Sequence, residues 1–188
     1  MAPSGAGESA ACRANYRWVK RVTDVLIGLG SNVGDRLAHL REAVDGLRSV
    51  LRLVEVSHVY ETSPVGVLTQ PPFLNAAVRG ETTAGPQRLF FWAKSLELAA
   101  GRRPGPRLGP RQLDLDIIAF GDLVVATPRL HIPHPAFAQR GFVLAPLADL
   151  APDLVLPGAE ATVTTLATRV GRAGIERAYP PESLSAPR

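Results

Sequence analysis

The order of apolar and polar positions along the chain predicts a strand, a helix and then a second strand. Apolar residues dominate Val22–Leu29, which is typical of a buried strand, and a glycine-rich turn over 30–34 follows it. Beyond Asp35, apolar residues recur at steps of three and four, as on the buried face of an amphipathic helix. These residues are Leu37, Leu40, Val44, Leu47 and Leu51. Leu53–Tyr60 then alternates as a second strand.

The next part of the chain repeats this pattern after a long loop. Three prolines within Thr62–Pro72 exclude a regular strand there, and Leu74–Arg79 predicts the third strand. Pro86 suits the first turn of a helix that ends at Gly101. The buried stripe of this helix comprises Leu89, Ala93, Leu96 and Ala100. A fourth strand is predicted within Gly109–Gly121.

This order, β-α-β-β-α-β, is that of a ferredoxin-like α+β fold. Two helices cover one face of its antiparallel sheet, so we expect the active site on the other face. Residues 1–21 lack hydrophobic periodicity and are expected to form a disordered extension, with a basic transit peptide as the alternative. Residues 22–188 are expected to form a single domain, with one more helix near Val163–Val170.

The composition narrows the class of protein. The chain has 188 residues, 46% of them apolar, and Cys12 is its only cysteine, so no disulfide or cysteine-based metal site forms within one chain. No apolar run approaches the ~20 residues that cross a bilayer, and we expect a soluble cytoplasmic protein. The net charge of +4 is carried almost entirely by arginine, so the positions of the arginines matter more than their sum.

Two carboxylates interrupt the fourth strand. Side chains alternate along a strand, so Asp114 and Asp116 share one face. Their neighbours Leu113, Leu115 and Ile117 point into the core. Two like charges held about 7 Å apart need a cation between them, or one of them must take a proton. Mg²⁺ suits two open carboxylates because substrate phosphates usually complete its shell. A solvated sheet face is the alternative.

A loop of arginine, glycine and proline precedes this strand. It places four arginines within ten residues: Arg102, Arg103, Arg107 and Arg111. One guanidinium group can bind two phosphate oxygens at once. Phosphoryl transfer relies on positioning of the phosphates and neutralisation of their charge. Together with the two aspartates, the loop predicts phosphoryl transfer. A disordered basic loop is the alternative.

Two further motifs are less specific. Gly28–Gly34 has the spacing GxGxxxG, one residue too long for a dinucleotide fingerprint, and favours a tight turn between strand and helix over a phosphate cradle. A second cationic cluster consists of Arg129, His131, His134 and Arg140. A triphosphate would use such a cluster, although a lone histidine in a loop is usually structural.

The segment Arg107–Ile118, RLGPRQLDLDII in one-letter code, resembles the signature of the 6-hydroxymethyl-7,8-dihydropterin pyrophosphokinases. Four other motifs stand in the order found in that family: Gly30–Gly34, Tyr60–Pro64, Phe73–Ala76 and His134–Leu144. The similarity runs from about Val25 to Pro157. It implies the family's activity, in which the β,γ-pyrophosphoryl group of ATP passes to the pterin's hydroxymethyl oxygen and AMP leaves, a step of tetrahydrofolate biosynthesis.

The resemblance also implies a role for each charged residue. Asp114 and Asp116 would hold two Mg²⁺ ions that bridge the triphosphate and the attacking hydroxyl. Arg102 or Arg103, together with Arg111, would act on the reacting phosphates. The residues expected to bind ATP are Lys94, Glu97, Arg107, Ile117, Arg129, His131, His134 and Arg140.

By the same resemblance, the pterin lies between Phe142 and the segment Thr62, Ser63, Pro64 and Val65, with Phe73 nearby and with Thr62 and Asn75 reading its polar edge. An aromatic face suits a flat heteroaromatic ring, and an amide both donates and accepts hydrogen bonds. The alternative for Phe142 is a place in the core. The expected partners are ATP and 6-hydroxymethyl-7,8-dihydropterin, bound by a monomer that contacts neither nucleic acid nor membrane.

The chain departs from the usual family pattern in the arginine loop. Leu108 stands where the family normally has a tryptophan, and the loop is one residue shorter, which leaves Arg102 and Arg103 as alternatives for one phosphate ligand. Another Mg²⁺-dependent nucleotidyl or phosphoryl transferase on the same fold is a competing function, which substrate assays separate. A nucleic-acid-binding sheet also competes, but the relevant strand face presents acids and no RNP-like aromatic pair.

Overall fold

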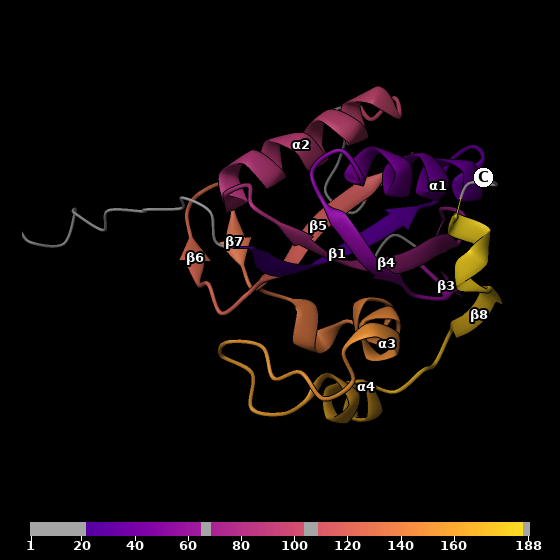
Figure 1. Ribbon diagram of the computed structural model, residues 1–188. Coiled ribbons are helices and arrows are strands. Elements are labelled where there is room, and N and C mark those ends of the chain that lie inside the picture. Colours follow the sequence, from indigo (N-terminus) through magenta and orange to yellow (C-terminus); the bar gives the residue numbers. More distant parts are fainter. Residues whose placement is uncertain (1–21, 65–68, 104–108, 186–188) are drawn as a thin grey trace, which may run out of the picture.

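The computed structural model describes residues 22–64, 69–103 and 109–185 (Figure 1). Predictions for residues 1–21, Val65, Arg107 and Leu108 lie outside these ranges. The elements are, in chain order, β1 (Thr23–Ser31), α1 (Arg36–Leu47), β2 (Arg52–Val56), β3 (Val59–Thr62), β4 (Phe73–Thr82), α2 (Pro86–Ala99), β5 (Asp114–Phe120), β6 (Val125–Ala126), β7 (His131–Ile132), η2 (Phe137–Gln139), α3 (Gly141–Leu150), α4 (Val163–Val170), β8 (Ile175–Tyr179) and η3 (Pro181–Leu184). None of the helices in these ranges is long and apolar enough to cross a membrane.

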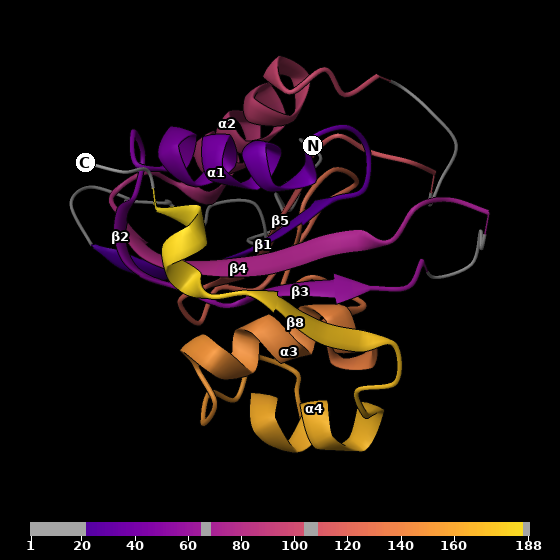
Figure 2. The ribbon, with the colours of Figure 1, turned by 90° about the vertical axis from the view of Figure 1, so that its right-hand side faces the viewer.

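The main sheet is antiparallel and has the strand order β5-β1-β4-β3-β8, with β2 also paired to β4. Strand β1 lies between β4 and β5 along most of its length. Figure 2 shows β8 at the outer edge beside β3. A separate hairpin is formed by β6 and β7.

Helices α1 and α2 cover one face of this sheet (Figure 1). Their buried side chains follow the predicted stripes and are at most 1% exposed: Leu40, Val44 and Leu47 in α1, and Leu89 and Ala93 in α2. The carboxylate of Asp35 accepts a hydrogen bond of 3.0 Å from the N–H of Ala38 and so caps α1. Helix α2 opens with Pro86, where no N–H partner is needed.

Helices α3 and α4 pack over part of the opposite face, against Leu26, Ala77 and Ile118 of the sheet. The predicted ferredoxin-like α+β class is confirmed, and the structure adds these two helices to the face that was expected to be left for the site. The predicted helix Val163–Val170 is α4. Helix α3 was not predicted, because Gly141 and Pro146 are unfavourable in helices. Burial of its leucines against the sheet stabilises it instead.

The predicted strand Leu53–Tyr60 is divided into β2 and β3 at Ser57. The Ser57 N–H donates to the carbonyl oxygen of Ala77 over 3.0 Å, and the Ser57 hydroxyl accepts from the N–H of Ala77 over 2.8 Å. A side chain thus takes the place of a backbone acceptor. The regular ladder ends there and resumes at Val59.

Leu89 provides a test of the buried face of α2, because its side chain is 0% exposed. We expect Leu89→Ala to lower the free energy of unfolding by about 2–5 kcal/mol, since buried area is lost and a cavity remains. Phe91→Ala on the same helix is the control, because Phe91 is 62% exposed, and its effect should stay within about 1 kcal/mol. Urea denaturation followed by circular dichroism measures both, and equal losses would contradict the assigned face.

Candidate active site

A cavity of about 340 Å³ opens where the ends of β1, β3, β4 and β5 meet the start of α3. Many of the predicted site residues line this cavity: Thr62, Ser63, Phe73, Asn75, Arg111, Asp114, Asp116, His134, Arg140 and Phe142. They come from segments that are far apart in the sequence. The fold therefore brings the predicted phosphate side and the predicted pterin side into one cavity.

The predicted alternation of β5 is confirmed. Leu113, Leu115 and Ile117 are at most 4% exposed and pack in the core beneath α1 and α2. Asp114 and Asp116 are partly exposed, with side-chain exposures of 23% and 41%, and both line the cavity. The two carboxylates thus lie on the face opposite the core.

Glycines on β1 form the cavity floor beside these aspartates. Gly28 pairs with Asp116, and Gly30 pairs with Asp114. A Cβ at Gly30 would lie 3.1 Å from Oδ1 of Asn75, so only glycine leaves that amide in place. The turn predicted over 30–34 is shorter than expected, because strand β1 continues through Ser31 and carries both Gly28 and Gly30.

Two arginines neutralise Asp114. One carboxylate oxygen accepts a hydrogen bond of 2.7 Å from Arg102, and the other accepts one of 2.5 Å from Arg111. All three side chains are about one-quarter exposed, so these ion pairs are screened less than those at the open surface. Of the two arginines, Arg111 lines the cavity, where its guanidinium group can also reach a ligand phosphate.

Glu97 lies behind β5, on the α2 side. Its carboxylate is 4% exposed, forms an ion pair with Arg102, and accepts hydrogen bonds from Nζ of Lys94 (2.6 Å) and from the N–H of Leu115 (2.8 Å). Two cations and a backbone donor offset the cost of burying this charge. Neither Lys94, Glu97 nor Ile117 lines the cavity, so their nucleotide contacts stay predictions.

His134 is held next to β5 by its N–H, which donates to the carbonyl oxygen of Ile118 over 3.2 Å. Its Nε2 lies 3.9 Å from Oδ2 of Asp116. Burial lowers the pKa of His134, and the nearby Asp116 only partly opposes that effect. The imidazole is therefore largely neutral at neutral pH.

The pterin-side residues form a smaller set of contacts. The amide of Asn75 donates a hydrogen bond of 2.7 Å to Oγ1 of Thr62, and both side chains are buried. Phe142 lies at the start of α3, with the guanidinium carbon of Arg140 5.7 Å from its ring centre. Phe142 therefore lies at the cavity and not in the core, which answers the alternative raised by its sequence.

Besides Lys94, Glu97 and Ile117, five predicted residues with described positions lie outside the cavity lining: Pro64, Arg102, Arg103, Arg129 and His131. Arg103, Arg129 and His131 are exposed, and the last two belong to the region of the β6–β7 hairpin. Val65 and Arg107 lie outside the described residues. Contacts of these residues with a ligand stay predictions.

The cavity suits a divalent cation that is held mainly by waters and by the phosphates of a bound substrate, with few protein ligands. Within the described ranges, no three or more histidine, cysteine, aspartate or glutamate side chains group as an enclosing metal site. Asp114 and Asp116 alone supply carboxylate oxygens on the cavity face of β5. Mg²⁺ is commonly bound by one or two carboxylates, with waters and substrate phosphates completing its shell.

Asn32 is a site residue to which the sequence assigned no role. It is 1% exposed, and its Oδ1 accepts a hydrogen bond of 2.7 Å from the N–H of Arg111. Its Nδ2 donates to Oε1 of Gln70 (3.0 Å) and to the carbonyl oxygen of Pro71 (3.2 Å). One amide thus joins the arginine segment to the loop before β4. The sequence offered only the Gly30–Gly34 motif as a signal.

The fold and the cavity together define an α+β protein that gathers paired carboxylates and guanidinium groups in one cavity, as expected of a phosphate-binding enzyme. The family model for 7,8-dihydro-6-hydroxymethylpterin-pyrophosphokinase (HPPK) matches residues 26–152. The chain belongs to this family.

Individual relatives agree with this membership. The chain is 48% identical over 128 residues to the mitochondrial folate synthesis bifunctional protein of Arabidopsis thaliana, which covers 68% of this chain but only 23% of that protein. It is 42% identical over 158 residues to the 2-amino-4-hydroxy-6-hydroxymethyldihydropteridine pyrophosphokinase of Methylorubrum extorquens, covering 83% of this chain and 99% of that one. Wild-type Plasmodium falciparum HPPK-DHPS with pteroate shares the fold, with a TM-score of 0.66 and 15% identity over 79% of this chain and 42% of that one.

The bridge made by Asn32 can be tested by changing one atom type. Asn32→Asp keeps an acceptor for Arg111 but turns a second oxygen toward Gln70 and Pro71, so we expect a loss of about 1–3 kcal/mol in unfolding free energy. Gln70→Ala is the graded comparison and should cost less, because Pro71 still accepts from Asn32. Urea denaturation reports both. An Asn32→Asp protein as stable as the wild type would show that the bridge contributes nothing.

Proposed function

We propose that this chain transfers a pyrophosphoryl group from ATP to the hydroxymethyl group of 6-hydroxymethyl-7,8-dihydropterin, giving the pterin pyrophosphate and AMP in tetrahydrofolate biosynthesis. The observation that carries the proposal is one cavity with two chemically different sides. Asp114, Asp116 and Arg111 give it a charged side suited to a triphosphate, while Asn75 and Phe142 give it a side suited to a flat polar ring. The names of the similar pyrophosphokinases support the same reaction.

The two aspartates are proposed to hold two Mg²⁺ ions together with the ATP phosphates. When bound, these ions neutralise phosphate charge and lower the pKa of the attacking hydroxyl. The chain contributes two carboxylate side chains on one face of β5. A neutral His134 beside Asp116 can donate a hydrogen bond to a phosphate oxygen.

Arg102 and Arg111 are proposed to exchange partners when ATP binds. Both guanidinium groups pair with Asp114 in the structure described here. A triphosphate offers the same arginines several anionic oxygens, and bidentate pairing with them is favourable. This exchange would free the Asp114 oxygens and place positive charge on the phosphates.

The pterin side is proposed to be ordered before the ligand arrives. One side-chain N–H of Asn75 donates a hydrogen bond to Thr62, which fixes the orientation of the amide. The amide oxygen and the second N–H are then held in a defined direction for a ligand. Those groups match the alternating donors and acceptors of a pterin ring edge. Phe142 offers an aromatic surface to the ring itself.

A product analysis tests the proposed reaction. The purified protein is incubated with ATP, Mg²⁺ and 6-hydroxymethyl-7,8-dihydropterin, and the nucleotides are separated by chromatography. AMP that forms in step with pterin pyrophosphate is the expected result. ADP would indicate single phosphoryl transfer, and an absence of pterin-dependent turnover would overturn the proposal.

Asp116 gives the sharpest mutational prediction. We expect Asp116→Ala to lower kcat by about a hundredfold or more, because one of two carboxylates for the metal is lost. The fold should stay intact, since the side chain is 41% exposed and Nε2 of His134 lies 3.9 Å away, too far for a hydrogen bond. Asp122→Ala, an exposed aspartate just beyond β5, is the control for the loss of one charge. Turnover and melting temperature are measured together, and near-wild-type turnover of Asp116→Ala would exclude the metal assignment.

A further inference from the structure

The residues near the C-terminus run beside the cavity. Residues 171–179, here named the C-terminal clip, include strand β8, which pairs with β3 (Figure 2). They lie beyond residues 26–152, which the family model matches. Any influence of the clip on the site is therefore additional to the motifs by which the family is recognised.

The clip contacts one wall of the cavity at the end of β3. The N–H of Ser63 donates to the carbonyl oxygen of Gly174 over 3.2 Å, and Thr62 pairs with Ile175. Gly174 has a φ of +68°, and a Cβ there would lie 3.2 Å from Oγ of Ser63. Thr62 and Ser63 both line the cavity, so the clip fixes part of its wall.

The clip also contacts the start of α3, which forms another wall. A Cβ at Gly141 would lie 2.6 Å from Cδ1 of Ile175 and 3.1 Å from the carbonyl oxygen of Gly171. Gly141 stands between Arg140 and Phe142, and both of these line the cavity. The same short segment therefore touches the two walls between which the pterin is proposed to bind.

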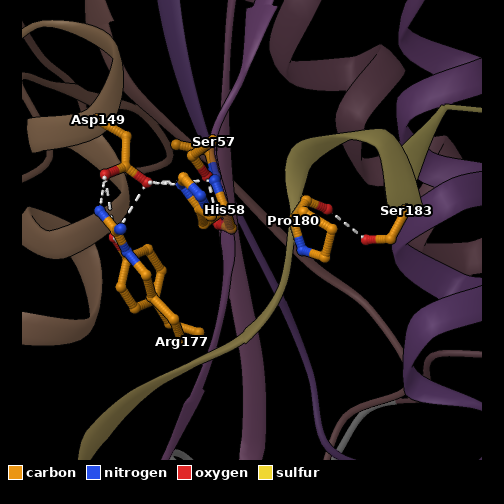
Figure 3. Close-up of polar contacts among 8 residues, drawn as sticks. Ser57, His58, Asp149, Arg177, Pro180 and Ser183 are labelled. Carbon is orange, nitrogen blue, oxygen red and sulfur yellow. Dashed lines mark hydrogen bonds and ion pairs between the residues drawn. The ribbon is translucent and has the colours of Figure 1, made fainter.

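Arg177 joins the clip to β3 and α3, the two elements that carry these walls, through a partly buried polar network (Figure 3). Its Nη2 donates to Asp149 of α3 over 3.1 Å, and its Nε donates to the Tyr60 hydroxyl over 3.2 Å. The Tyr60 hydroxyl lies 3.0 Å from both oxygens of Asp149. The backbone N–H and the ring Nδ1 of His58 each lie 3.1 Å from the same carboxylate.

The network is built around the Tyr60 hydroxyl, which burial keeps protonated. Tyr60 is 1% exposed, and burial raises its pKa, so the phenol stays protonated and can donate to Asp149. The guanidinium of Arg177 also lies 5.9 Å from the centre of the Tyr60 ring. Because Arg177 itself is half exposed, its ion pair alone would contribute little, and its hydrogen bond to the buried tyrosine matters more.

We propose that Arg177 is a positioning residue for the pterin side of the site, holding Thr62–Ser63 at the end of β3 and the start of α3 in register with one another. This inference rests on the proposed function. Tyr60 and Thr62 lie two residues apart on β3, and Asp149 lies on the same helix as Phe142. A change at Arg177 should therefore reach the pterin walls while leaving Asp114, Asp116 and their arginines in place.

The first test separates the two substrates. We expect Arg177→Met to raise the KM for the pterin by about five- to tenfold, as for the loss of one or two hydrogen bonds, while kcat and the KM for ATP stay within about twofold. Arg177→Lys should recover part of the loss, because an ammonium can still pair with Asp149 but cannot reproduce both contacts of the guanidinium. Arg88→Met, at an exposed arginine near the start of α2, controls for the change in charge.

A second pair of variants tests the clip through its backbone. Gly174→Ala forces a side chain toward Ser63 at a left-handed position, and Gly158→Ala imposes the same kind of backbone strain at φ +78° with nothing within 4 Å. We expect only Gly174→Ala to raise the KM for the pterin. All assays are run well below the melting temperature of each variant, so that loss of folded protein does not enter the kinetics.

The outcomes distinguish this inference from the proposed function. A wild-type protein without pterin-dependent AMP formation would overturn both. An active wild type whose Arg177→Met and Gly174→Ala variants keep the wild-type KM for the pterin would overturn the positioning role alone. Equal rises in the KM for ATP and for the pterin would also overturn it, because they would indicate a general loss of structure.

Discussion

The contact of Asp114 with Arg102 and Arg111 is the interaction on which the rest of the site depends. Asp114 and Asp116 share one face of β5, and two carboxylates so close repel unless cations are near. The arginines supply those cations in the chain itself and draw the end of α2 to the start of β5. A bound triphosphate could compete for the same guanidinium groups, so the contact that balances charge without a ligand also prepares the site for an anionic one.

The position of β5 relative to α2 depends in turn on a buried carboxylate. Glu97 accepts a hydrogen bond from the N–H of Leu115 and forms ion pairs with Lys94 and Arg102. One side chain of α2 therefore holds both strand β5 and Arg102 in place. On the neighbouring strand, Gly28 and Gly30 keep the floor beside the aspartates free of side chains. The charge of the two aspartates and the space left by the two glycines therefore lie on the same face of the sheet and define the cavity.

The sequence predicted those parts of the fold that local periodicity determines. Alternation in β5 separated Asp114 and Asp116 from the core, and three-to-four spacing located the buried faces of α1 and α2. Contacts between distant segments could not be predicted in this way. Asn32 contacts Gln70 and Arg111, which lie 38 and 79 positions further along the chain. The polar strand β8 pairs with β3 only because the chain returns to that edge of the sheet. Helix α3 depends on tertiary burial, which outweighs the propensity of Pro146.

The most direct measurement of the central claim is anomalous diffraction from crystals grown with Mn²⁺ in place of Mg²⁺ and a non-hydrolysable ATP analogue. We expect Mn²⁺ signal in contact with the carboxylates of both Asp114 and Asp116, with Arg102 and Arg111 turned from Asp114 to the phosphates. Nucleotide bound elsewhere, with both arginines still paired to Asp114 and no metal at the aspartates, would contradict it.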